Sequence, residues 1–115
     1  MGKIQKVPVV FYKTAAGVVV VREWLRSLPE ADRNTIGRDL MRVQYRWPVG
    51  MPLCRPLGGG LWEVRSDLPS SRIARLLFCF NKGRLVVLHG FIKKTQKAPA
   101  DEMEIARKRK DELTS

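Results

Sequence analysis

The sequence has few cysteines, and they are poorly placed for cross-linking. Cys54 and Cys79 are the only two in 115 residues, and they form no CxxC pair. This excludes a disulfide framework and gives no sign of a structural zinc site, as expected for a protein of a reducing cytoplasm. Cys79 lies in an apolar run and is predicted to be buried, whereas Cys54 lies in a proline-rich stretch where it could be exposed.

Long hydrophobic runs are also missing. No apolar stretch reaches the roughly 18 residues that a membrane-spanning helix requires. Residues 7–12 and 15–21 are apolar, but Lys13 separates them and no clean small-residue cleavage site follows, so we expect no signal peptide. The sequence therefore predicts a cytoplasmic protein with no membrane partner.

Basic residues outnumber acidic residues two to one. The chain has 22 lysines and arginines, 11 aspartates and glutamates, and a formal net charge of +11. That charge exceeds the roughly 2–8 that suits a small soluble domain. It favours a polyanionic partner, which is nucleic acid, an acidic protein or anionic lipid, without choosing among them.

The size and apolar content predict one globular domain over residues 1–115. Apolar residues make up 44% of the chain. A chain of this length buries roughly two-thirds of its unfolded surface, so it needs neither a disulfide nor a metal to fold.

Helical periodicity appears in three segments. Residues 20–28 predict a short helix. Pro29 is placed to open a longer helix, whose apolar stripe is Ile36, Leu40, Val43 and Trp47, and Pro48 should end it. A last helix is predicted over residues 100–113, after Pro99.

Strand patterns separate these helices. The predicted strands are residues 7–12, 61–66, 72–80 and 85–92, and residues 48–60 are predicted to form a loop because of their prolines and glycines. The order β-α-α-β-β-β-α predicts an α+β fold with a small antiparallel or mixed sheet of about four strands. We expect the helices to pack on one face and the opposite face to carry charged side chains.

Several charged residues are predicted to meet on that open face. Arg65 and Glu63 share one side of their strand, and Arg75 points to the non-core side of the next strand. The preceding loop contributes Arg55, and the last strand ends at Lys93 and Lys94. Arginine and lysine side chains in such a patch suit phosphate oxygens.

RNA cleavage fits a basic patch of this kind because RNA carries its own nucleophile, the 2′-hydroxyl. Preorganised cations can stabilise the developing charge without a metal or other cofactor. Metal-dependent cleavage needs a carboxylate cluster, and the sequence shows none.

Structural roles are the alternative for each residue. Arg65 could pair with Glu63 within the sheet, and Lys93 and Lys94 could protect a strand end. His89, the single histidine, is either a core or interface residue or a general base.

Three stretches taken together resemble a known family. They are LWEVR at residues 61–65, RIARLLF at 72–78 and LHGFIKKTQK at 88–97, and the pattern extends over nearly the whole chain from Val7. This combination is similar to phage-derived HigB-like members of the RelE/ParE toxin superfamily.

The resemblance implies a RelE-like fold and the toxin of a type II toxin–antitoxin system. That toxin would be a ribosome-dependent mRNA endonuclease that inhibits translation. Its partners would be the ribosome, mRNA and a cognate helix-turn-helix antitoxin, with which it could form a hetero-oligomer. The positions that match the family's phosphate-binding basic residues are Arg65 and Arg75. The family commonly has a histidine or tyrosine as acid or base near the end of the last strand; this chain has no tyrosine there and His89 lies earlier, so Lys93, Lys94 or Glu63 is the expected substitute. We expect Arg55, Arg72, His89 and Lys97 to bind RNA.

Two other functions remain open at this point. The ParE branch shares the fold but inhibits a protein target such as gyrase and cleaves nothing. A simple nucleic-acid-binding module would also explain the charge.

Overall fold

A computed structural model describes residues 6–93 and 100–114. In chain order, its elements are β1 (Val9–Phe11), α1 (Val20–Arg26), α2 (Glu30–Arg46), β2 (Cys54–Gly58), β3 (Leu61–Asp67), β4 (Ile73–Asn81), β5 (Arg84–Lys93) and α3 (Ala100–Thr114). The seven predicted elements are all present, and their ends lie close to the predicted ones. The sequence did not predict β2. None of the helices in the described residues is long and apolar enough to cross a membrane.

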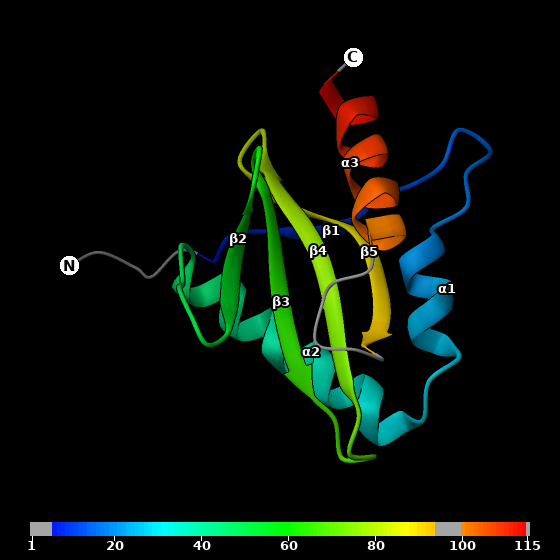
Figure 1. Ribbon diagram of the computed structural model, residues 1–115, viewed down its shortest axis with the longest axis vertical. Coiled ribbons are helices and arrows are strands. Elements are labelled where there is room, and N and C mark those ends of the chain that lie inside the picture. The colour runs from blue at the N-terminus through cyan, green and yellow to red at the C-terminus, as the bar shows by residue number, and fades with distance from the viewer. Residues whose placement is uncertain (1–5, 94–99, 115) are drawn as a thin grey trace.

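The strands form one sheet in the order β1-β5-β4-β3-β2 (Figure 1). β1 pairs with β5 in parallel, and the other neighbouring strands are antiparallel. The α+β class and the mixed, mainly antiparallel sheet are therefore confirmed, but the sheet has five strands instead of about four.

β2 lies within the segment that was predicted to be a loop. It is an edge strand that pairs only with β3, and an edge strand tolerates Pro56 because one side of it needs no hydrogen-bond donors. Cys54, whose exposure the sequence left open, is buried, because this pairing turns its side chain into the core beside Val64. Burial raises the pKa of the Cys54 thiol to about 11.

α1 and α2 cover one face of the sheet. Ile36, Leu40 and Val43 of α2 are buried there, as the helical stripe predicted. They form one cluster with side chains from alternate positions of the strands: Val64, Ala74, Leu76, Phe78, Leu85 and Val87.

α1 approaches β5 closely at Gly90. A Cβ atom on Gly90 would lie 2.6 Å from Cζ3 of Trp24, which is closer than real Cβ contacts. The missing side chain therefore makes room for the indole ring against the strand.

α3 packs against the opposite face, so the prediction that all helices lie on one face was wrong (Figure 1). Leu77 and Cys79 of β4 and Leu88 of β5 point to this second face and pack with Ala106 of α3. The physical reason is that β4 and β5 are apolar on both sides, and a strand of this kind requires cover on both sides. Because α3 contacts mainly β4 and β5, part of the second face is left for other side chains.

Candidate functional site

Charged side chains gather on the second face of the sheet, at the end that lies away from the apolar contacts of α3. The strand register places Arg55 of β2 opposite Glu63 of β3, and Arg65 of β3 opposite Arg75 of β4. Directly opposite residues share a face, and so do residues two apart on one strand. These four side chains, together with Lys93 of β5, form what we call the charged cluster.

Glu63 lies between two arginines of the cluster. Its Oε1 is 3.5 Å from Nη2 of Arg55, and its Oε2 is 3.2 Å from Nη1 of Arg75. The side chains of Glu63 and Arg75 are only 5% and 4% exposed, whereas that of Arg55 is 45% exposed. The site therefore has a buried ion pair at its base and a third charged group at its rim.

The buried pair has unused hydrogen-bonding capacity. Arg75 and Glu63 are in ion-pair contact, but no hydrogen bond joins them. Among the described residues, Nε and Nη1 of Arg75 and Oε2 of Glu63 have no hydrogen-bond partner. Buried donors of this kind normally have a partner, so Arg75 is suited to an incoming acceptor.

Arg65 contacts a different carboxylate from Glu63, the partner that the sequence offered as an alternative. Its Nε lies 3.5 Å from Oδ1 of Asp67, and its side chain is 46% exposed. The alternative of an ion pair between Arg65 and Glu63 is therefore not what the structure shows: Arg65 pairs with Asp67, and Arg75 pairs with Glu63. Each of the two neighbouring arginines has its own carboxylate, which offsets their mutual repulsion.

Lys93 completes the cluster from the end of β5. It lies two residues beyond Phe91, which is opposite Arg75, so its side chain lies on the same face. Loss of solvation lowers the pKa of Lys93, and the positive charges of Arg75 and Arg65 lower it further, against a smaller opposing effect of Glu63. A lysine with a lowered pKa gives up its proton more readily than an ordinary one.

A small pocket opens on the cluster. Its lining residues are Met51, Pro52, Leu53, Arg55, Glu63, Arg65 and Arg75. Three guanidinium groups thus border one hollow, an arrangement that suits a phosphate group.

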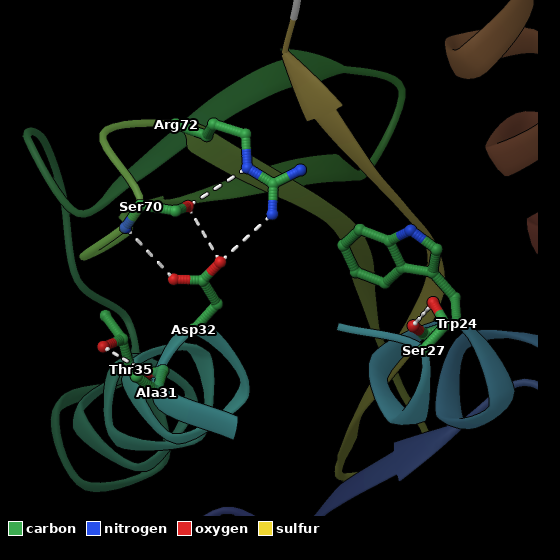
Figure 2. Close-up of polar contacts among 7 residues, drawn as sticks. All are labelled: Trp24, Ser27, Ala31, Asp32, Thr35, Ser70 and Arg72. Carbon is green, nitrogen blue, oxygen red and sulfur yellow. Dashed lines mark hydrogen bonds and ion pairs between the residues drawn. The ribbon is translucent and has the colours of Figure 1, made fainter. Parts of the chain in front are cut away.

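Arg72, which was predicted to bind RNA, lies outside the cluster. Its Nη2 is 3.1 Å from Oδ2 of the buried Asp32, and Ser70 donates its hydroxyl to the same carboxylate at 2.8 Å (Figure 2). Burial alone raises the pKa of Asp32, but the hydrogen bonds from Ser70 and Arg72 outweigh it and hold that pKa below its usual value. Arg72 therefore ties the turn between β3 and β4 to α2.

His89 is also separate from the cluster, at the contact between β5 and α3. Its Nε2 contacts the carboxylate of Glu102, and Nη1 of Arg109 lies 3.4 Å from its Nδ1. Arg109 also donates to the backbone oxygen of Leu88 at 2.8 Å. The structure thus gives His89 the interface position that the sequence left as one of two alternatives. The predicted Lys94 and Lys97 lie outside the described residues.

The sequence did not single out Asp39 and Arg42 of α2, which lie beside the cluster. They line a second pocket together with Arg65. Neither residue belongs to the apolar stripe predicted for this helix, and no local pattern showed that the end of β3 lies next to them. In the structure, Ser66 donates its hydroxyl to Asp39 at 2.7 Å.

One comparison with known proteins gives a match. The model of the family described as phage derived protein Gp49-like (DUF891) matches residues 23–111, which is more than half of the chain. The matched range includes the whole charged cluster. No curated protein matches the chain.

Proposed function

Since this chain belongs to the phage-derived Gp49-like family, a RelE/HigB-like toxin family, we propose that it is the toxin of a type II toxin–antitoxin pair. We further propose that it is an endoribonuclease that cleaves mRNA on the ribosome and thereby stops translation. Its partners would be the ribosome, mRNA and a helix-turn-helix antitoxin that neutralises it in a hetero-oligomer in the cytoplasm.

The observation that carries this proposal is the buried Arg75 with two unpartnered donors. Nε and Nη1 of Arg75 are buried and lack partners among the described residues. Leaving a buried donor unpaired costs about 1–3 kcal/mol. A phosphodiester in the pocket that Arg55, Arg65 and Arg75 line would bring oxygen acceptors to these guanidinium groups.

The reaction follows from the chemistry of RNA. The 2′-oxygen attacks the neighbouring phosphorus, the bond from phosphorus to the 5′-oxygen breaks, and the products are a 2′,3′-cyclic phosphate and a 5′-hydroxyl. One proton must leave the 2′-hydroxyl and one must reach the 5′-oxygen. Neither step requires a metal ion. The described residues contain no group of three histidine, cysteine, aspartate or glutamate side chains that could hold one.

The cluster contains side chains for each of these tasks. Arg75 and Arg65 would bind the phosphate and stabilise the negative charge that develops on it. The Glu63 carboxylate would accept the proton of the 2′-hydroxyl. Lys93, whose pKa is lowered by loss of solvation and by neighbouring arginines, would donate the proton to the 5′-oxygen.

The test is to express the wild type and single variants without antitoxin and to map cuts in cellular mRNA by primer extension. Arg65→Ala and Lys93→Ala should relieve growth arrest and remove the cuts. Arg26→Ala is the matched control, because Arg26 is an exposed arginine of α1 that pairs only with its helix neighbour Glu23 among the described residues. This variant should remain toxic.

Two results would contradict the proposal. Growth arrest without any cuts at translated codons would show a non-nucleolytic toxin that acts on a protein target. Full toxicity of both Arg65→Ala and Lys93→Ala would show that the charged cluster is not the active site.

A further inference from the structure

A second, larger pocket adjoins the charged cluster. Its volume is about 510 Å³, and its lining residues are Thr35, Asp39, Arg42, Pro52, Leu53, Arg65 and Asp67. We call it the α2 groove. Pro52, Leu53 and Arg65 also line the pocket on the cluster. Because the two hollows share these three residues, one nucleic-acid strand could place neighbouring groups in both.

The groove exists because β3 is longer than its partner β2. The pairing of β2 with β3 starts at Cys54 opposite Val64, so residues 65–67 of β3 have no β2 residue beside them. The backbone N–H of Arg65 donates to the backbone oxygen of Leu53 at 3.1 Å. This hydrogen bond holds the loop that precedes β2 at one side of the groove. α2 forms the other side, and the free edge of β3 lies between them.

The groove differs from the charged cluster in its balance of charge. Two carboxylates, those of Asp39 and Asp67, line it beside the guanidinium groups of Arg42 and Arg65. Asp39 is 14% exposed and accepts hydrogen bonds from Ser66 at 2.7 Å and from Arg42 at 3.2 Å. A carboxylate has about four lone-pair sites, so Asp39 retains acceptor capacity toward the groove.

Asp67 offers a more accessible acceptor. Its side chain is 79% exposed, and its ion pair with Arg65 is long, at 3.5 Å. The pair of carboxylates disfavours a second phosphate in the groove, because like charges repel. A neutral group that carries N–H donors suits it better, and nucleobases with an exocyclic amino group have such donors.

We propose that the α2 groove is a base-specificity subsite that binds adenine, cytosine or guanine next to the cleaved phosphodiester and discriminates against uracil. Asp39 and Asp67 would accept hydrogen bonds from the exocyclic amino group, which uracil lacks. Arg65 would stand between the two pockets and contact the phosphate. This inference rests on the proposed function, since it assumes that RNA binds the charged cluster.

NMR titration of the full-length protein with short RNAs tests the subsite without requiring cleavage. The probes are trinucleotides with 2′-O-methyl groups, which remove the nucleophile. One probe carries uracil throughout, and the others carry adenine, cytosine or guanine at one end. We expect about tenfold tighter binding of an amino-bearing probe than of the uracil probe, which corresponds to one good polar contact. Shifts should appear at Thr35 and at residues 65–67.

Asp67→Asn and Asp39→Asn provide the decisive comparison. Each should lower the preference against uracil, because the asparagine oxygen still accepts a hydrogen bond but carries no charge. The uracil probe should bind at least as well as before, because an acidic group has been removed beside a phosphate. Asp101→Asn is the control for net charge, because Asp101 is exposed at the start of α3. That control should keep the preference.

The outcomes separate this inference from the proposed function. If the wild type binds all probes equally, or if both aspartate variants keep the full preference, the subsite is refuted while RNA binding stands. If no probe binds and no residue of the charged cluster shifts, the subsite is refuted, whereas the proposed cleavage on the ribosome is judged separately by growth arrest and the cuts in mRNA.

Discussion

Removal of Glu63 should destabilise the fold more than removal of Arg75. In Glu63→Leu, the guanidinium group of Arg75 stays in a position where its side chain is only 4% exposed, without its carboxylate. Removing one partner of a buried pair costs about 3–5 kcal/mol, because the other charge is left uncompensated. Arg55, Arg65 and Lys93 add further positive charge nearby, so we expect a value in the upper part of this range.

Arg75→Met should cost less, about 1–3 kcal/mol. In this variant Glu63 keeps a counter-charge, because Arg55 remains 3.5 Å from its Oε1. The Arg55 side chain is 45% exposed and therefore a weaker partner. The double variant Glu63→Leu with Arg75→Met should lie within about 1 kcal/mol of the wild type, since an apolar replacement of both partners leaves no buried charge.

Urea unfolding followed by tryptophan fluorescence and circular dichroism measures these differences. A domain of this size has a free energy of unfolding of about 5–15 kcal/mol, so a loss of 3–5 kcal/mol is readily resolved. Glu23→Leu is the control, because the ion pair of Glu23 with Arg26 is exposed on both sides and should change stability by less than about 1 kcal/mol. A Glu63→Leu variant as stable as the wild type, or less affected than Arg75→Met, would refute the reasoning.

Three further predictions concern packing and protonation. Gly90→Ala should destabilise the protein by about 1–3 kcal/mol in the same urea assay, because the new methyl group would collide with the ring of Trp24. In the proposed mechanism Lys93 must be protonated to donate, and its pKa is lowered, so cleavage should decline with rising pH at a lower pH than the pKa of an ordinary lysine, about 10.4, would give; a cleavage rate that stays constant up to that pH would contradict this. Asp32 has a lowered pKa in the folded state, so its stabilising effect is present above about pH 4 and is lost as the pH falls further; the difference in stability between the wild type and Asp32→Asn should therefore shrink in acid, and a constant difference from pH 7 to pH 2 would contradict this.

Much of the fold could be predicted because its signals are local. The stripe of α2 depends on residues three and four apart, and Pro48 ends it directly. The hairpin between β4 and β5 depends on residues 81–83, whose turn chemistry is read from three adjacent side chains. The alternation in β3 correctly placed Glu63 and Arg65 on one face.

The features that were missed depend on tertiary contacts. β2 is a strand because β3 offers it an edge to pair with, which the prolines and glycines of residues 48–60 do not show. The second-face position of α3 follows from the apolar residues that β4 and β5 present on both sides. That signal was visible in the sequence of β4, where Leu77 and Cys79 alternate with core residues but lie on the side of Arg75.

The sequence predicted which residues form the candidate site but not which of them form ion pairs with one another. The shared face of Arg65 and Arg75 follows from strand alternation once the hairpin register is known. Which carboxylate each arginine contacts depends on distances across strands, and here Glu63 turns to Arg75 instead of Arg65. Arg72 is as basic as its neighbours, yet it pairs with Asp32 of α2, a contact between residues far apart in the chain.

The second face of the sheet must satisfy two opposing physical requirements. At one end, Leu77 and Leu88 are buried under α3, and that apolar contact stabilises the fold. At the other end, a helix in the same position would block access to the charged cluster. The side chains there must therefore exclude water from the core without a helix above them. The pairing of Glu63 with Arg75 does this by burying two charges against each other. Because an apolar pair in the same place should be about equally stable, stability alone does not explain why charges are there, whereas the proposed binding of a phosphodiester would.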